Sequence, residues 1–589
     1  MEVMKRLAVL GTVGAVLSIG VQPSASYSPD TLAMLDPSPM ARNLCGNRGG
    51  DKSLRARLML AASVSQVPAG AVPLYDGLGG VSFPVTTSNP LAQRYFDQGL
   101  VLAYGFNHAG AIRAFQEAQR LDPDCAMCWW GEAFAHGPNI NAPMEASVLD
   151  DALNAVRQAE RLAPGASPLE RALIVAIARR YSPAPTADRA TLDAAYADAM
   201  LAAARLFPSH DELAALAAEA AMDTSAWNYW EPDGRTARPR LGEAISLIEG
   251  VLARNPDHPQ ASHLYIHLME NSAEPRRAEA AADRLAKPLV PGAGHLVHMP
   301  AHIYLRLGRY RDSIRANVAA ARADEDYLNR SGEAGLVRYG YYPHNVHFIV
   351  TSAQMAGDLG TAVRESRRLG TIIDAETARR IAWIQPIQAA PYLAFAQAAS
   401  PAQILALDEP AGKLPYVAAM RHYARAIARA QQRNRRAFEQ EIDALRALRD
   451  GGDFALMIEQ GVPAPELLQL AELVARGRLA YAERRYADAT ELYRQAIAIE
   501  GALSYMEPPW WYYPVRQSLG AALYRAGRYE DAREAFRGAL VQAPNNGWAL
   551  YGLAVTERAL SNRVEAAAAE HALSQAWLGN RKWLRMDRL

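Results

Sequence analysis

The sequence contains little of what several large protein classes need. It has only three cysteines, Cys45, Cys125 and Cys128, too few for a disulfide framework in a chain of 589 residues. Basic and acidic residues number 62 each, so the basic excess typical of nucleic-acid-binding proteins is missing. No phosphate-binding glycine loop or nucleophile elbow occurs, and no later apolar run is long enough to cross a membrane. We therefore expect no nucleic-acid partner and no membrane span in the mature protein.

Strand signals are scarce as well. Alternating runs of valine and isoleucine are few, whereas alanine dominates many segments, and this composition favours helix throughout. Apolar residues make up 50% of the chain, which is ample for a buried core. The length exceeds what one core usually spans, so the chain is expected to form several domains or an array of repeats.

The N-terminus has the pattern of an export signal. A short basic start precedes an apolar run from Leu7 to Val21, and small residues just before Tyr27 suit cleavage at that position. The run is short for a membrane span, although an uncleaved anchor is the alternative. We expect residues 1–26 to be a signal peptide and the protein to be periplasmic or secreted.

Internal repeats predict the fold. Four sets of residues share offsets of 4, 3 and 5 positions; they begin at Ala111, Ala152, Ala244 and Ala532, and each ends on a proline. These offsets match the second half of a helix–turn–helix repeat of roughly 34 residues. One helix pair cannot bury its apolar face alone, so neighbouring pairs must stack. The sequence therefore predicts an all-α, right-handed superhelical solenoid in which the first helix of each pair lines the concave side.

The same residues resemble the tetratricopeptide repeat family over roughly residues 91–575. The stretches AQRYFDQGL, FNHAGAIRAF, LDPDCAMCWWGEA and GPNIN together resemble an exported bacterial subgroup of that family. The resemblance implies a scaffold that holds a peptide or protein partner on its concave face. We divide the chain into a partly irregular leader and entry segment (27–90), an N-terminal array (91–400) and a C-terminal array (401–589).

Seven of the 13 histidines fall within one 85-residue window. The repeat phase, which can be set from other residues, starts successive helix pairs at Pro259, Gly294 and Pro343. This phase places all seven histidines on one face of three first helices, because spacings of three and four share a helix face. The seven are His263, His267, His295, His298, His302, His344 and His347.

We interpret this stripe of histidines as a transition-metal site, because imidazole suits copper, zinc, iron and nickel. The i, i+4 pairs His263/His267 and His298/His302 have the spacing that chelates a metal ion. We expect them to face each other and form a four-nitrogen core, and the other three histidines to complete the site or bind a second ion. Copper is favoured for an exported, nitrogen-rich site, with zinc and iron as alternatives. Glu270, on the same stripe, is a candidate ligand, orienting group or catalytic base.

Two function classes follow. The first is a metal-binding protein, with oxidation by a copper or iron enzyme or hydrolysis by a zinc enzyme as the reaction if it is catalytic. The second is a scaffold whose concave groove binds a peptide or small-molecule ligand without catalysis. A groove of histidines that binds a peptide or an anion, with or without pH dependence, belongs to this second class.

Other motifs receive structural interpretations. Cys125 and Cys128 form a C-x-x-C pair without the following histidine of a haem site, so a local disulfide or simple packing is expected. His108 is expected to make a structural hydrogen bond. Insertions are expected at three places: GPNIN (137–141) over the groove rim, and aromatic-rich segments at 223–240 and 507–514. The aromatic clusters either wall a pocket or cap exposed helix ends.

Overall fold

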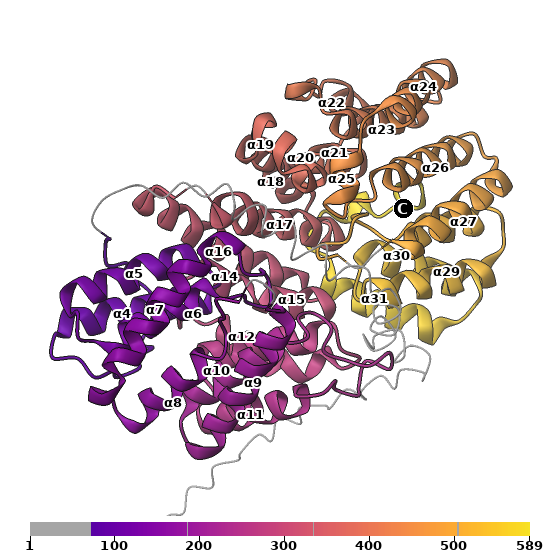
Figure 1. Cartoon of the computed structure of the whole chain (residues 1–589). Helices are drawn as coiled ribbons and strands as arrows, with labels where there is room; N and C mark the ends of the chain where they lie inside the picture. Colours follow the sequence, from indigo (N-terminus) through magenta and orange to yellow (C-terminus); the bar gives the residue numbers. More distant parts are fainter. Residues whose placement is uncertain (1–71, 185–186, 334, 504–505) are drawn as a thin grey trace, which may run out of the picture.

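The computed structural model describes residues 72–184, 187–333, 335–503 and 506–589 (Figure 1). Helices account for 72% of the structure, and no strand occurs in the described residues; a single isolated bridge joins Trp230 and Ala237. The all-α prediction is confirmed. The predicted signal peptide and most of the predicted leader lie outside the described residues.

In the described part of the first half, the first helix begins at residue 90. Its helices are α4 (Pro90–Tyr104), α5 (His108–Leu121), α6 (Ala126–His136), α7 (Leu149–Leu162), α8 (Pro168–Ile177), α9 (Arg189–Leu206), α10 (Asp211–Asp223), α11 (Leu241–Arg254), α12 (Pro259–Glu270), α13 (Glu279–Leu285), α14 (Gly294–His298), α15 (Pro300–Arg306), α16 (Tyr310–Ser331), α17 (Tyr342–Ala356) and α18 (Leu359–Ile372).

The second half continues without a change of architecture. Its helices are α19 (Ala375–Arg380), α20 (Gln385–Gln388), α21 (Ala390–Ala398), α22 (Pro401–Leu405), α23 (Pro415–Gln431), α24 (Arg435–Gly451), α25 (Ala455–Glu459), α26 (Ala464–Ala482), α27 (Tyr486–Ala502), α28 (Val515–Arg525), α29 (Tyr529–Gln542), α30 (Gly547–Ala559) and α31 (Arg563–Ala576).

Successive helices pack as antiparallel pairs, and the repeat residues explain why. Phe115 of α5 is fully buried, and a Cβ added at Gly99 or Gly131 would lie 2.7 or 2.4 Å from its ring. Phe536 of α29 fills the corresponding space, where a Cβ at Gly552 would lie 2.2 Å from its ring. Each large aromatic therefore needs a glycine on the neighbouring helix, and this complementarity fixes the stacking of one pair on the next.

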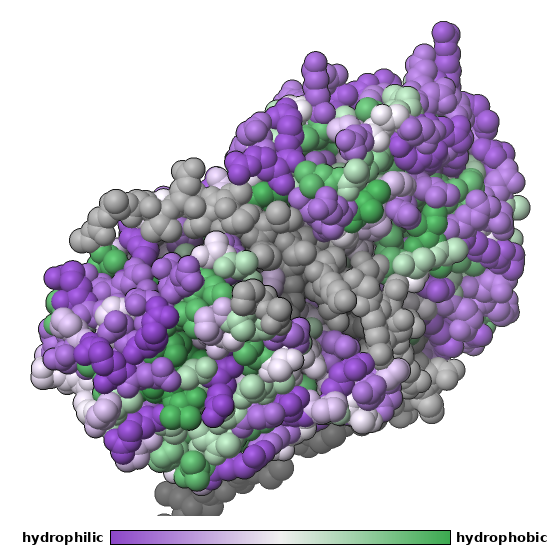
Figure 2. Space-filling view, viewed as in Figure 1, coloured by the Kyte–Doolittle hydropathy of each residue, from purple (hydrophilic) through white to green (hydrophobic). Residues whose placement is uncertain are grey.

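The three predicted insertions occur where the pattern placed them. They lie in the long connections between α6 and α7, between α10 and α11, and between α27 and α28. In Figure 2 the outer helices α27 and α29 present mostly hydrophilic side chains, as expected for a solvent-facing layer. The insertions lie on the inner side instead, where they contact residues of the histidine-bearing helices.

The end of the chain folds back on its middle, so α30 lies beside α17 (Figure 1). The Tyr310 hydroxyl donates to the Pro544 carbonyl at 2.7 Å, and the Trp548 indole donates to the Gln354 carbonyl at 2.8 Å. Buried apolar residues form two clusters, which overlap in sequence between α15 and α17. The division of the arrays at residue 400 stays a prediction.

Candidate metal centre

The seven histidines lie on three neighbouring inner segments of the N-terminal half. α12 carries His263 and His267, α14 and α15 carry His295, His298 and His302, and α17 carries His344 and His347. The predicted starts of these helices agree with the structure to within one residue.

Close packing fixes where α14 begins. A Cβ at Gly294 would lie 1.9 Å from the Asp324 carboxylate, so only glycine fits there. This contact sets α14 against α16 and thereby sets the position of His295.

Three rings form the first triad, His263, His267 and His295, whose ligand nitrogens all lie within 4.8 Å of one another. His263 Nδ1 lies 3.0 Å from Gln260 Oε1, and His267 Nδ1 lies 2.6 Å from Glu270 Oε1. Because these oxygens can only accept, each Nδ1 carries the proton and each Nε2 presents a lone pair. Neither Nε2 has a hydrogen-bond partner in the described residues, and the same holds for both nitrogens of His295.

The second triad consists of His298, His302 and His344, again with ligand nitrogens within 4.8 Å. His298 Nδ1 lies 2.6 Å from Asn317 Oδ1, whose amide nitrogen donates to the Ser313 carbonyl. That second bond orients the Asn317 oxygen towards the ring, so His298 also presents an Nε2 lone pair. Its Nε2 lies only 2.8 Å from the Nε2 of His302.

Two carboxylates lie on the other side of His302. Its Nδ1 is 2.6 Å from Glu270 and 2.5 Å from Glu507, and all three groups are buried. Burial alone would lower the pKa of His302, but the two carboxylates outweigh it and raise this pKa to about 10. His302 is therefore an imidazolium in this structure, and its Nε2–H donates to His298. The same charge holds the pKa of Glu270 at about 2 against the opposing effect of burial.

The remaining rings of the two triads are neutral. Burial is the largest influence on each and lowers its pKa, with neighbouring histidines adding to the effect at His263, His295, His298 and His344. At His267 the carboxylate of Glu270 opposes burial, yet the pKa still falls below its ordinary value. Neutral imidazole is the form that binds a metal ion, so these rings need no deprotonation before they bind.

The two triads adjoin each other. The ring centres of His267 and His302 are 6.2 Å apart, and those of His295 and His298 are 6.1 Å apart. Two-metal sites hold their ions roughly 3.5–4 Å apart. Two triads that adjoin in this way could therefore hold one ion each in a paired site. The expected four-nitrogen core of two facing i, i+4 pairs is not the grouping found. Both pairs are present, but each is completed by a third histidine instead.

His347 lies outside both triads. Its ring packs 4.9 Å from that of Tyr512, and neither of its nitrogens has a hydrogen-bond partner in the described residues. Burial lowers the pKa of His347 to about 3. His347 faces the inner side as predicted, but Tyr512 of the insertion before α28 packs against its ring.

The site is covered, not open to a groove as the sequence led us to expect. Phe106 packs 4.8 Å from the His263 ring, Trp227 packs 5.2 Å from His267, and Tyr341 packs 4.5 Å from His295. These aromatic residues come from the α4–α5 turn, the 223–240 insertion and the π-helical turn Val337–Tyr341 just before α17. Aromatic walls exclude water from the imidazoles, which strengthens any electrostatic interaction inside.

The GPNIN stretch is buried beneath this cover instead of lying over a rim. The Asn141 side chain accepts from the Trp227 indole at 3.2 Å and lies 3.4 Å from the Tyr341 hydroxyl. It therefore links two of the covering aromatics. Asn139 lies 3.1 Å from His108 Nε2, which agrees with a structural role for that histidine. Cys125 and Cys128 form a local disulfide at the start of α6.

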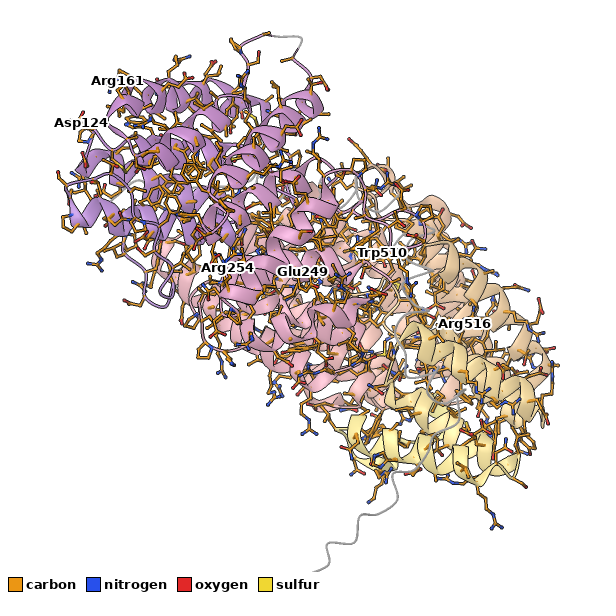
Figure 3. The ribbon with its side chains drawn as sticks, turned by 90° about the horizontal axis from the view of Figure 1, so that it is seen from below. Asp124, Arg161, Glu249, Arg254, Trp510 and Arg516 are labelled. Atoms are coloured by element: carbon orange, nitrogen blue, oxygen red, sulfur yellow. A yellow bond between two sulfur atoms is a disulfide. The ribbon has the colours of Figure 1, made fainter. Side chains whose placement is uncertain are left out.

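Sequence reasoning missed Gln260, Asn317 and Glu507. Gln260 stands three residues before His263, so the helical period contained a signal for it. Asn317 lies on the second helix of its repeat, where no pattern marks it. Glu507 is 205 residues from His302 in sequence and reaches it only because the chain folds back. Trp510, labelled in Figure 3, belongs to the same insertion and lies where the two halves of the molecule meet.

A match to one family model supports the repeat assignment. A family model described as a tetratricopeptide repeat matches residues 514–556, which include α28 and α29. The search of curated proteins finds no match. Among solved structures, the human IFIT1 dimer with PPP-AAAA is 13% identical, with 81% of this chain and 89% of that chain covered and a TM-score of 0.27. Yeast Tom70 is 12% identical, with 82% and 89% covered and a TM-score of 0.22.

The TPR domain of P58(IPK) is 12% identical, with 80% of this chain and 98% of that chain covered and a TM-score of 0.20. The family match alone identifies a tetratricopeptide repeat, at residues 514–556 of this array of helix pairs. None of the described helices combines the length and the apolar character needed to cross a membrane.

Proposed function

We propose that this protein binds a pair of transition-metal ions, one in the triad His263, His267 and His295 and one in the triad His298, His302 and His344. The observation that carries the proposal is the set of buried imidazole nitrogens without partners that converge in the first triad. Burying such a nitrogen unpaired costs roughly 1–3 kcal/mol. A bound ion would satisfy several of them at once.

The hydrogen bonds around the rings support the same conclusion. Metal-binding histidines typically donate their other ring N–H to a carboxylate or carbonyl, which fixes the tautomer and the ring orientation. Gln260, Glu270 and Asn317 accept from His263, His267 and His298 in this way. A polar lining for a peptide would not need one nitrogen of His263 and of His267 to be held and the other left bare.

Copper is the favoured ion, and zinc and iron are the alternatives. The two triads offer six nitrogens and no sulfur, and copper(II) stands highest in the affinity order for such ligands. Glu507 already accepts from His302, and Glu270 accepts from His267 and forms an ion pair with His302, so both carboxylates act as orienting groups in this arrangement. Two adjacent redox-active ions in a water-excluded pocket would suit an oxidoreductase. A zinc pair would instead suit hydrolysis.

Metal analysis of the purified full-length protein tests the proposal. We expect about two copper, zinc or iron ions per chain, about one in His295→Ala, about one in His344→Ala, and none in the double variant. His295 and His344 are chosen because neither makes a hydrogen bond that the fold would lose. The exposed His571→Ala variant is the matched control and should retain both ions. Absence of any transition metal, with no tight binding of added Cu²⁺ or Zn²⁺ at neutral pH, would overturn the proposal.

A scaffold that binds a protein or peptide partner is the second candidate, because the matched repeat at 514–556 belongs to a family of such scaffolds. Export to the periplasm or the medium is also proposed, on the N-terminal pattern alone. Sequencing the N-terminus of the protein recovered from cell fractions tests it. A terminus near Tyr27 supports export, and an intact Met1 in the cytoplasm contradicts it.

A further inference from the structure

A second cavity lies in the C-terminal array, far along the chain from the histidines. Its volume is about 930 Å³, and the inner helices α23, α26, α28 and α30 of four successive pairs line it. A short helical turn at Met586–Arg588 lies across it. Pockets for small ligands usually measure roughly 300–1,000 Å³, so this cavity has the size of a ligand site.

The charge of its lining is strongly one-sided. One acidic residue, Asp587, faces six arginines: Arg433, Arg478, Arg484, Arg525, Arg585 and Arg588. Asp587 pairs with Arg585 at 2.5 Å, and the other five arginines form no salt bridge within the part of the chain that the structure describes. Since the whole chain is balanced in charge, this gathering of unpaired arginines is a local property of the cavity.

Arg588 is surrounded by like charge from neighbouring arginines. Arg478 donates to the Arg588 carbonyl at 3.4 Å, and Arg588 Nη1 is buried without a hydrogen-bond partner in the described residues. Burial lowers the pKa of Arg588, Asp587 opposes this, and Arg585 and Arg478 lower it further. An anion placed among these groups would relieve the repulsion and satisfy the bare nitrogen.

The remaining walls are aromatic. Tyrosines 423, 481, 486, 513, 524 and 551 line the cavity. The Tyr481 and Tyr486 rings meet edge to face at 5.5 Å, and the Tyr481 hydroxyl accepts from Arg525 at 3.3 Å. Tyr513 comes from the 507–514 insertion, so one of its predicted aromatics does wall a pocket. Tyrosine supplies a flat apolar surface beside a polar edge, which suits a planar organic group.

We propose that this cavity binds a small organic anion that combines a flat ring with phosphate or carboxylate groups. The guanidinium groups would bind the oxygens in pairs, and the phenol rings would pack on the planar part. The site is separate from the metal pair and does not depend on it.

Calorimetric titration of the full-length protein at low salt tests the proposal. Three probes are used. Pyrophosphate tests binding of phosphate groups, benzene-1,2,4,5-tetracarboxylate tests binding of a flat ring with carboxylate groups, and benzamide is a neutral ring without an anionic group. We expect at least one of the two anions to bind, its affinity to fall at high salt, and benzamide not to bind. Arg478→Gln/Arg588→Gln should lower the affinity for the anion that binds at least tenfold. Binding that persists in a His295→Ala/His344→Ala variant would show that the site is independent of the metal proposal.

Matched variants guard against a change in fold or in total charge. Arg525→Gln/Arg585→Gln removes two exposed arginines at the rim and should also weaken binding. This variant tests the proposal if Arg478→Gln/Arg588→Gln, at partly buried positions, fails to fold. Arg436→Gln/Arg494→Gln removes the same charge from exposed positions outside the cavity and should bind like the parent. Failure of both anions to bind the parent protein overturns the proposal. Equal affinity in the parent and in both cavity variants also overturns it. So does a loss of affinity in Arg436→Gln/Arg494→Gln as large as that in the cavity variants.

Discussion

At the scale of single residues, the acceptors around the histidines decide which nitrogens are available. Gln260, Glu270 and Asn317 each hold an Nδ1–H, and the opposite Nε2 of the ring then faces the centre. Further hydrogen bonds orient the acceptors themselves. For example, the Gln260 amide nitrogen donates to Glu219 at 3.0 Å. The ligand geometry therefore depends on side chains that would never touch the ion.

Replacing one acceptor tests this dependence. Asn317→Leu keeps the size of the side chain but removes the oxygen that holds His298 Nδ1. We expect the affinity for the ion of the second triad to fall by roughly 10–100-fold, with the helical content unchanged by circular dichroism. Asn329→Leu, at an exposed position on the same helix, is the control and should bind like the parent. Equal affinity in the two variants would show that Asn317 has no orienting role.

The charge of His302 gives a second test at this scale. With its pKa raised to about 10, His302 is protonated at pH 8, and an ion that takes its Nε2 must displace that proton. Binding to the second triad should therefore release about one proton, and its affinity should fall about tenfold for each unit of pH below the pKa. Calorimetry in two buffers of different ionisation enthalpy measures this release. The first triad, isolated in His344→Ala, is neutral and should release none.

At the scale of helices, the repeat period predicted much of what is found. The starts at Pro259, Gly294 and Pro343 and the shared face of the seven histidines all follow from periodicity. The repeat period carries no information about how far an insertion folds inward. It therefore could not show that Trp227 would cover His267, that Tyr512 would stand in front of His347, or that a third ring would complete each pair.

The end of α27 allows a pH test of the fold itself. Burial raises the pKa of Glu500 to about 7, although its carboxylate accepts from Gln542 at 3.0 Å and from the Val515 amide at 3.3 Å. A carboxyl group whose pKa is higher in the folded state binds its proton more tightly there. Its contribution to stability is therefore lost as pH rises from about 4.5 to 7.

Glu500→Gln keeps an acceptor for the Val515 amide but cannot ionise. We expect the thermal midpoint of the parent to fall relative to that of the variant between pH 5 and pH 8. The free-energy difference should reach at most about 3 kcal/mol, since one pKa unit corresponds to about 1.4 kcal/mol. Parallel midpoints across this range would contradict the assignment.

At the scale of the whole molecule, the return of the C-terminal helices onto α16 and α17 joins distant parts into one site. Glu507 lies between α27 and α28, yet it contacts His302. Nothing in the local pattern around Glu507 marks it, because its position depends on the path of every repeat between residues 302 and 507. Stacking of helix pairs can be predicted from sequence, whereas the accumulated curvature that closes the array cannot.

The closure can be disturbed at one glycine. Gly357 follows α17 with φ +76°, and a Cβ there would lie 2.2 Å from the Trp577 ring. Gly357→Ala therefore combines two costs: the left-handed backbone, about 1–2 kcal/mol, and overpacking against Trp577, typically about 1–3 kcal/mol more. Gly527→Ala is the matched control, because Gly527 has the same φ of +76° but no atom within 4 Å of the added carbon.

We expect Gly357→Ala to lower the thermal midpoint more than Gly527→Ala does. Loosening the contact between α17 and the end of the chain should also loosen the approach of Glu507 to His302. The affinity of the second triad for its ion should then fall, while that of the first triad, which has no ligand or acceptor from the C-terminal half, should stay unchanged. Thermal denaturation and metal titration of both variants measure these effects.

Equal midpoints in the two glycine variants would mean that Trp577 yields without strain. Equal losses at both triads would mean that the closure supports the whole centre, not the part that Glu507 reaches.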